Sequence, residues 1–373
     1  MKKQKVDVAA YIWPAYSGAE PRNHIFWPEG AGEWETVKRA VPKFEGHKWP
    51  RVPLLGYQDE ADPKVMEEQI KLALSHGVNV FIYDWYWYDD RAFQEQCLDE
   101  GFLGAANTKD MRFYLMWANH DANHLWDRRL ACTDIGSTVI WSGSVSAETY
   151  KKIGLRWLEK YFGLENYYRI DGKPVLAIYD VATFVTGVGG VKRATELMEW
   201  LDAEAKERGL GGVHFQLIHW NRKNKNLSGV DGSAIEMTHD DVLYKMPFSS
   251  ATNYQYVHFA KVDRPYPEVM ERVREEWDRL SSLGEKKYYP HVSLGWDNNP
   301  RFATTLRPNI LRENTPENIE EALRAAKELA IRTNAPLVTV NSWNEWTEGS
   351  YLLPDDLYGY GYLEAVKRVF LEE

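Results

Sequence analysis

Cysteine is scarce in this chain, with only Cys97 and Cys132 among 373 residues. Neither belongs to a C-x-x-C motif or to a Cys/His cluster, so the sequence signals neither a structural zinc site nor redox chemistry. A single bridge between them is the most that the sequence allows, which excludes a disulfide framework. We therefore expect no metal site.

Long apolar runs are also lacking, and none approaches the roughly 18 to 20 residues of a transmembrane helix. The basic residues at 1–5 lead directly into the strand-like run from Val6 to Tyr11, without the apolar stretch of a signal peptide. We expect no membrane span and a cytoplasmic location for the sequence as written. The location would be periplasmic or secreted if a native export signal has been removed.

Positive charge is in deficit, since 45 Lys and Arg face 55 Asp and Glu for a formal net charge of -10. Such a field repels polyphosphates and anionic membrane surfaces. The chain also has no G-x-x-x-x-G-K-[ST] loop, and no G-x-G-x-x-G follows its first predicted strand. We expect no nucleic-acid partner and no phosphate-binding loop of the Rossmann or P-loop type.

Short β-branched runs alternate with longer segments of helical period, a pattern that predicts parallel strands joined by crossover helices. The predicted strands are 7–13, 78–84, 112–118, 174–180, 213–219, 233–237, 289–294 and 337–341. The predicted helices are 64–76, 91–101, 147–162, 191–208, 266–283, 316–333 and 360–370. Without a Gly/Ser-rich or Pro-rich linker, this favours one domain over residues 1–373, a single (β/α)8 TIM barrel with long βα loops. A doubly wound open sheet is the alternative.

Aromatic residues are abundant, with 16 Trp and 22 Tyr, and many stand beside polar residues at the ends of predicted strands. Catalytic residues of a (β/α)8 barrel lie at those ends. Flat rings stack on sugars, while carboxylates and amides bind sugar hydroxyls, although some of these side chains could instead cap helices or satisfy buried backbone groups. The predicted substrate-binding residues are Trp13, Asp84, Trp85, Trp117, Asn119, Asp180, His219, Trp220, Glu236, Trp296, Asp297, Arg301, Asn341, Trp343 and Trp346.

The segment 341–349 carries two glutamates three residues apart, Glu345 and Glu348, among tryptophans. In a helical or turn-like segment this spacing would put their Cβ atoms about 5 to 6 Å apart. Carboxyl pairs in retaining glycosidases are separated by about 5 to 5.5 Å, less than inverting enzymes need. Repulsion between the two carboxylates should raise one pKa, leaving a protonated acid beside an ionised base. We therefore predict that Glu345 and Glu348 are catalytic, with an exposed acidic pair as the alternative.

The chain resembles the WbsX-like group, related to glycoside hydrolase family 99, over essentially its whole length. The motifs that carry the resemblance lie at 10–14, 26–28 with 33–34, 83–87, 295–301 and 341–349, leading to 353–355 and 358–360. The resemblance implies a (β/α)8 barrel that cleaves an α-mannosidic linkage with retention. It further implies that Glu345 deprotonates the sugar 2-hydroxyl, giving a 1,2-anhydro sugar, and that Glu348 is the general acid/base. This mechanism requires no cofactor.

Two other functions are weighed for this chain. WbsX-like proteins are often labelled glycosyltransferases of O-antigen synthesis, but the sequence has neither a D-x-D motif nor a Rossmann-type glycine loop. A non-catalytic carbohydrate-binding barrel would need the aromatic residues without an acid, and the Glu345/Glu348 pair argues against it. The expected partner is an oligosaccharide or polysaccharide, with α-mannosidic or rhamnose-containing glycans as the first choices.

Two further features have competing interpretations. Arg301 could bind an anionic sugar substituent or form a structural ion pair with Asp297 or its neighbours. His120 and His124 have the i, i+4 spacing of some metal sites, but the intervening glutamate of H-E-x-x-H is missing, so we expect solvated or sugar-contacting histidines.

Overall fold

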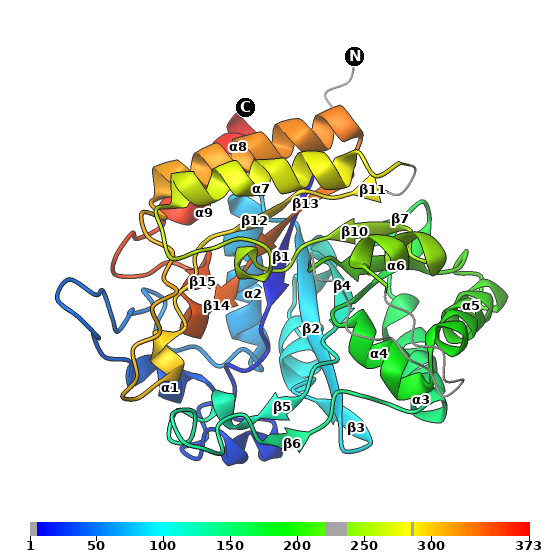
Figure 1. Cartoon of the computed structure of the whole chain (residues 1–373), viewed down its shortest axis with the longest axis horizontal. Helices are drawn as coiled ribbons and strands as arrows, with labels where there is room; N and C mark the ends of the chain where they lie inside the picture. Colours follow the sequence, from blue (N-terminus) through cyan, green and yellow to red (C-terminus); the bar gives the residue numbers. More distant parts are fainter. Residues whose placement is uncertain (1–5, 221–236, 285–286) are drawn as a thin grey trace.

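A curled, mainly parallel sheet forms the centre of the protein in the computed structural model, which describes residues 6–220, 237–284 and 287–373 (Figure 1). The strands follow the order β11-β10-β9-β8-β4-β2-β1-β13-β12, and the pairs along this path are parallel. Their bounds are β1 Asp7–Ile12, β2 Val80–Tyr88, β4 Arg112–Trp117, β8 Lys173–Ile178, β9 His214–Ile218, β10 Ser250–Thr252, β11 Lys287–Tyr288, β12 His291–Ser293 and β13 Leu337–Asn341. The fold is therefore barrel-like.

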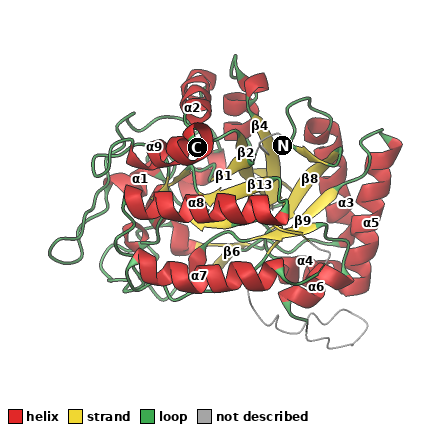
Figure 2. Ribbon diagram, turned by 90° about the horizontal axis from the view of Figure 1, so that it is seen from above, coloured by secondary structure: helices red, strands yellow, loops and turns green. Residues whose placement is uncertain are grey.

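Helices surround this sheet, as the view from above shows (Figure 2). Their bounds are α1 Trp34–Lys38, α2 Pro63–Ser75, α3 Ala147–Trp157, α4 Val181–Val188, α5 Val191–Glu207, α6 His239–Lys245, α7 Tyr266–Ser281, α8 Pro316–Thr333 and α9 Gly361–Lys367. Short strands lie in the connections: β3 Arg91–Phe93, β5 Ala122–Asn123, β6 Val139–Trp141, β7 Arg169–Ile170, β14 Asn344–Glu345 and β15 Ser350–Tyr351. Within the described ranges, no helix is long and apolar enough to cross a membrane.

Side-chain caps mark the starts of two of the helices predicted from the sequence, those over 64–76 and 316–333. Asp62 accepts a hydrogen bond from the Lys64 backbone amide, and α2 begins at Pro63. Thr315 caps α8, which begins at Pro316 and ends at Thr333 as predicted. In both cases a side-chain oxygen satisfies a free amide of the first turn, and proline follows where no amide partner is needed.

One predicted element is wrong, and another lies almost entirely outside the described residues. The helix expected over 91–101 is instead strand β3, paired antiparallel with β2, followed by a short π-helix at Cys97–Phe102. The hairpin forms because β2 continues to Tyr88, and Asp89 and Asp90 adopt left-handed backbone angles (φ 52° and 58°) that suit a tight turn. The predicted strand 233–237 lies outside the described residues except for Met237, which is in no strand. The strand next to β9 in the sheet is β10, whose short Ser-Ala-Thr sequence gives no β-branched run to detect.

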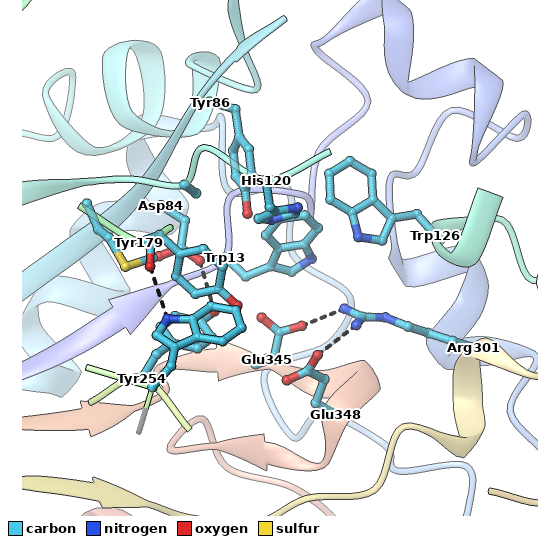
Figure 3. Close-up of a pocket in the computed structure, with 13 residues that line it drawn as sticks. Trp13, Asp84, Tyr86, His120, Trp126, Tyr179, Tyr254, Arg301, Glu345 and Glu348 are labelled. Carbon is cyan, nitrogen blue, oxygen red and sulfur yellow. Dashed lines mark hydrogen bonds and ion pairs between the residues drawn. The ribbon is translucent and has the colours of Figure 1, made fainter. Parts of the chain in front are cut away.

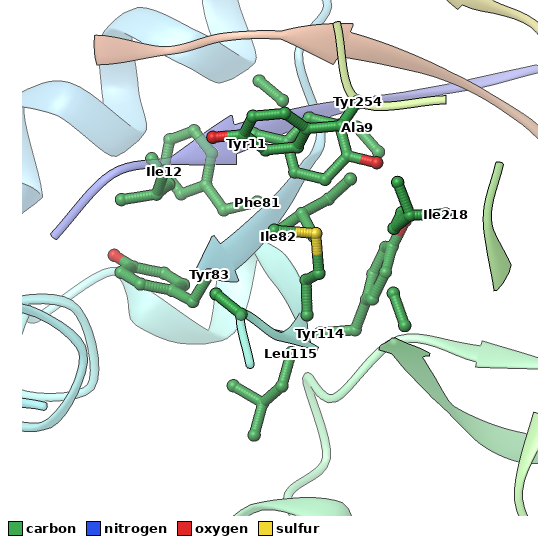
Figure 4. Packing of buried hydrophobic residues seen from close by; sticks show 14 of the residues in the cluster. Ala9, Tyr11, Ile12, Phe81, Ile82, Tyr83, Tyr114, Leu115, Ile218 and Tyr254 are labelled. Atoms are coloured by element: carbon green, nitrogen blue, oxygen red, sulfur yellow. The ribbon is translucent and has the colours of Figure 1, made fainter. Parts of the chain in front are cut away.

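Alternate residues of the strands face the inside of the sheet and form the core there (Figure 4). Tyr11 and Tyr114 are fully buried, and each hydroxyl has a partner: Tyr11 donates to the Asn253 carbonyl and Tyr114 to Gln216 Oε1. Along each strand, every second residue faces inward. The inward-facing residues at the ends of the strands, beyond the core, reach the cavity described below.

Candidate active site

A cavity of about 230 Å³ opens at the carboxyl ends of the central strands (Figure 3). Its wall combines aromatic rings, carboxylates, one histidine and one arginine. The lining residues are Trp13, Asp84, Tyr86, Met116, Ala118, His120, Trp126, Tyr179, Trp220, Tyr254, Arg301, Glu345 and Glu348. Such a wall of rings with a few convergent polar groups is typical of a small-molecule or sugar site.

The period of the strands explains most of this lining. On β2, Asp84 and Tyr86 face the cavity, and Trp85 between them faces away. On β4 and its continuation, Met116, Ala118 and His120 line the cavity. Because successive side chains of a strand point to opposite faces, each strand end supplies alternate residues to the site.

Glu345 and Glu348 come from the connection that follows β13. Glu345 ends the short strand β14, and Glu348 ends the 3-10 helix Trp346–Glu348. The Glu345 amide donates to Ser342 Oγ at 2.7 Å, and the Trp346 amide donates to the Tyr16 hydroxyl at 3.1 Å. These buried hydrogen bonds fix the turn, so that both carboxyl groups point into the cavity (Figure 3).

One guanidinium group joins the two glutamates. Arg301 Nη2 donates to Glu345 Oε1 and Nη1 to Glu348 Oε1, both at 2.7 Å (Figure 3). Its Nε donates to Glu33 Oε1 at 3.1 Å, and Glu33 is fully buried. Arg301 therefore pairs with three glutamates, and its guanidinium bridges the two that line the cavity.

Glu33, Glu345 and Glu348 share the single positive charge of Arg301. Burial raises the pKa of Glu345 well above its usual value, and the neighbouring Glu348 adds to the effect. Burial also raises the pKa of Glu348, while Arg301 lowers it in part. Because the two groups are coupled, they retain a proton between them at a pH where an exposed glutamate has lost it.

Asp84 brings a third carboxyl group to the cavity from β2. Its Oδ2 accepts a hydrogen bond from the Tyr254 hydroxyl at 2.9 Å. Its Oδ1 is buried and has no hydrogen-bond partner within the described part of the chain. Burial raises the pKa of Asp84 well above its usual value. A buried, unsatisfied oxygen at a cavity wall is a ready acceptor or donor for a ligand hydroxyl.

Glu60 supports this wall from behind. Its Oε2 accepts a hydrogen bond from Asn344 Nδ2 at 2.8 Å. Asn344 in turn donates to the Trp13 carbonyl and accepts from the Trp13 amide. Burial raises the pKa of Glu60 to about 8. A protonated Glu60 thus holds the residue before Glu345 against the strand end that carries Trp13.

Comparison with known proteins adds to this geometry. The family model described as "Glycosyltransferase WbsX" matches residues 8–366. The chain belongs to the glycosyltransferase WbsX family. The WbsX resemblance expected from the sequence motifs is thereby confirmed.

The curated relatives of this WbsX-family chain include two proteins named "Uncharacterized protein WxcX" from two strains of Xanthomonas campestris pv. campestris. Each is 28% identical over 360 residues, which is 93% of this chain and 47% of the relative. The chain therefore spans about half the length of the curated relatives it matches.

Solved structures with the same fold include glycoside hydrolases. A protein described as glycoside hydrolase-like matches with a TM-score of 0.65 and 13% identity, over 99% of this chain and 95% of its own. The family 99 endo-α-mannosidase of Bacteroides thetaiotaomicron, solved with bis-tris-propane, matches with a TM-score of 0.59 and 14% identity, over 99% and 98% of the two chains. At 13% and 14% identity, these structures share the fold of the chain.

Six of the residues predicted from the sequence line the cavity of this WbsX-family chain. They come from the connections after β1, β9, β12 and β13 and from β2: Trp13, Asp84, Trp220, Arg301, Glu345 and Glu348. Arg301 contacts the glutamates and Glu33, not Asp297. Asp297 instead accepts hydrogen bonds from His47 Nε2 at 2.7 Å and Trp49 Nε1 at 2.6 Å.

Other predicted residues lie on the outer faces of the strands and contact the helices. Trp85 donates to Glu95 and packs against Trp157 of α3. Trp117 packs against Trp157 and against Phe184 of α4. His219 bonds to Asp240 of α6, and Trp343 donates to Gln69 of α2, so both join the sheet to the helix layer.

The remaining predicted residues make contacts elsewhere or lie outside the described residues. Asn119 exchanges two hydrogen bonds with the backbone of Asp180, whose carboxylate caps α4. Asn341 accepts from Gln255, Trp346 stacks on Tyr351, and Trp296 is partly buried against the core. Glu236 lies outside the described residues.

Sequence reasoning missed several lining residues: Tyr86, Met116, Ala118, His120, Trp126, Tyr179 and Tyr254. Strand period could have found Tyr86, since it lies two residues after Asp84. The sequence favoured a solvated or sugar-contacting role for His120 over a metal ligand, but His120 was not among the predicted substrate-binding residues. It lines the cavity, and burial lowers its pKa. Over residues 6–220, 237–284 and 287–373 there is no group of three or more His, Cys, Asp or Glu side chains that could hold a metal ion.

Proposed function

We propose that this protein is a retaining glycoside hydrolase that acts on an oligosaccharide or polysaccharide. The observation that carries the proposal is the pair of buried carboxyl groups, Glu345 and Glu348, held on one guanidinium at the wall of an aromatic cavity. The rings of Trp13, Trp126 and Trp220 suit the apolar faces of a sugar. Asp84, with its unsatisfied oxygen, suits a sugar hydroxyl.

The proposed reaction has two steps. Glu345 takes the proton of the 2-hydroxyl while that oxygen attacks the anomeric carbon, and Glu348 gives its proton to the departing glycosidic oxygen. Water then opens the 1,2-anhydro sugar at the anomeric carbon, Glu348 takes a proton from the water, and Glu345 returns its proton to the 2-oxygen. Two inversions give net retention. Burial raises the pKa of both carboxyl groups, so the pair keeps one proton, which the proposed first step uses from Glu348.

The proposal includes a complete (β/α)8 barrel built as one domain over residues 1–373. It is supported by the two ends of the strand order. β11 pairs with β10 and β12 pairs with β13, yet only Tyr289 and Pro290 separate β11 from β12 in the chain. A single interrupted strand would thus join the two edges of the sheet.

A glycosyltransferase is the second candidate, and the description of the family favours it. The two functions differ in the donor, since a nucleotide-sugar transferase consumes an activated sugar and a hydrolase consumes a glycosidic bond and water. A carbohydrate-binding protein without activity would show neither reaction.

The test is a hydrolysis screen on α-mannans, rhamnose-containing polysaccharides and O-antigens, without nucleotide sugar or metal. Glu345→Gln and Glu348→Gln are compared with Glu207→Gln, a control at an exposed position of α5. We expect the first two variants to lose about 10²- to 10⁴-fold in rate, the usual contribution of general acid-base catalysis, and the control to keep it. NMR of the first product should show the retained anomer. Undiminished hydrolysis by Glu348→Gln, an inverted product, or turnover of nucleotide sugars alone would contradict the proposal.

A further inference from the structure

Two cations, Arg128 and Lys43, bind carbonyl groups of the loop that carries Arg301. Arg128 Nε donates to the Pro300 carbonyl at 3.2 Å. Lys43 Nζ donates to the carbonyls of Phe302 and Ala303 at 2.6 and 2.7 Å. Arg301 stands between these acceptors in the chain and binds both glutamates. The two cations therefore bind the chain on either side of Arg301.

The segment that carries Arg128 also contributes to the cavity. Trp126 lines the cavity, and Arg128 follows it by two residues. Arg128 also lines a small surface depression, whose other charged residues are Arg39, Arg129, Glu35 and Asp127. The Cα atoms of Trp126 and Arg128 are at most roughly 7 Å apart, so a ligand that extends from the cavity past Trp126 approaches the loop that carries Arg128.

Arg128 and Lys43 have no carboxylate partner in the described part of the chain. Their neighbours differ: Arg39 pairs with Glu29, and Arg129 pairs with the buried Asp127. Besides burial, the charge of Arg128 lowers the pKa of Lys43, and that of Arg39 lowers the pKa of Arg128. The Cys132 thiol lies beside both cations and raises their pKa values in part. Crowded cations without carboxylate partners, on a chain of net charge -10, provide local attraction for an anion.

The thiol of Cys132 lies beside Lys43 and Arg128. Partial burial would raise its pKa, but hydrogen bonds from the backbone and hydroxyl groups of Thr304 and Thr305 lower it to about 6. These two residues directly follow the carbonyls that hold Lys43. The surroundings of Cys132 thus favour negative charge, and the thiol is exposed, unlike that of Cys97.

We propose that Lys43 and Arg128 bind an anionic group of the carbohydrate substrate, a uronate carboxylate or a phosphate substituent, on a sugar adjoining the one in the cavity. Arg301, which the sequence suggested for this role, is already held by three carboxylates. This inference rests on the proposed carbohydrate function, because it specifies the class of substrate. Planar guanidinium and flexible ammonium groups together suit either anion.

The test measures how anions protect Cys132 from alkylation by iodoacetamide, a neutral reagent. The probes are methyl α-D-glucuronoside, its uncharged methyl ester and inorganic phosphate, at constant ionic strength and pH. The proteins are the wild type, Arg128→Gln, Lys43→Met and the control Lys192→Gln, an exposed residue of α5. No turnover is involved, so the result is independent of whether hydrolysis is found.

We expect saturable protection by the glucuronoside or by phosphate, but not by the ester, in the wild type and Lys192→Gln. Arg128→Gln and Lys43→Met should each weaken it about tenfold, the factor for loss of one charge-assisted hydrogen bond. Protection by only one anion would identify the substituent. Equal protection by the ester, unchanged protection in Arg128→Gln, or none by any anion would overturn the proposal, even if the protein hydrolyses glycans.

Discussion

Replacing Glu60 with glutamine tests the electrostatics of the cavity wall without touching the cavity. Glu60 is fully buried, and its oxygens accept hydrogen bonds from Asn344 and Gln69. Burial raises its pKa from 4.5 to about 8, so the carboxyl is protonated in the folded protein at neutral pH. Glutamine copies the shape and neutrality of that protonated form but cannot ionise.

The magnitude follows from linkage between folding and proton binding. Between pH 4.5 and about 8 the folded chain holds a proton on Glu60 that the unfolded chain has released. Its contribution to stability is therefore fully present below pH 4.5 and is lost as the pH rises through about 8. At about 1.36 kcal/mol per pH unit, the loss amounts to about 5 kcal/mol by pH 9.

The assay is urea unfolding followed by tryptophan fluorescence at intervals from pH 5 to 9. We expect Glu60→Gln to match the wild type near pH 5 and to gain on it by about 1.4 kcal/mol for each pH unit up to about pH 8. Other buried carboxyl groups titrate equally in both proteins, so the difference isolates Glu60. Parallel curves, or a gain that Glu207→Gln reproduces, would refute the reasoning.

Three further predictions concern the cavity. Arg301→Gln should move the whole bell-shaped rate profile to higher pH, because Arg301 lowers the pKa of both Glu345 and Glu348; an unmoved profile contradicts this. Asp84→Ala should raise KM for the substrate found in the screen by roughly 10- to 100-fold, the effect of losing one hydrogen bond to a charged or polar group. Asp84→Asn should raise KM less. Unchanged kinetics in Asp84→Ala would exclude contact between Asp84 and the substrate. Trp85→Ala should lower the free energy of unfolding by about 3 to 5 kcal/mol with little change in KM. A raised KM with unchanged stability would contradict the outward orientation of Trp85.

Local signals predicted much of the fold. Capping residues placed the starts of α2 and α8, because an N-cap acts through its own nearest amides. The region after Asp84 was mispredicted because the hairpin of β2 and β3 is stabilised by pairing across the turn, and the residues at 91–101 also carry a helical period. The strand β10 has only three residues, and its position in the sheet depends on neighbours far away in sequence.

The site was predicted in part for a similar reason. Glu345 and Glu348 are close in sequence, so their spacing alone brought them together. Glu33 is more than 260 residues from Arg301, and their contact depends on the closure of the fold. Choosing adjacent residues at strand ends, such as Asp84 and Trp85, mixed the inward and outward faces, which only the two-residue period separates.

The shared guanidinium of Arg301 has a consequence for the proposed cycle. At the start Glu345 is ionised and Glu348 protonated; in the anhydro intermediate the two states are exchanged; after hydrolysis they are restored. The pair thus carries a single negative charge at every stage, always opposite the same cation. The protonation states of the two glutamates change, but the total charge beside Arg301 stays constant. The surrounding side chains therefore need little reorganisation between the two steps.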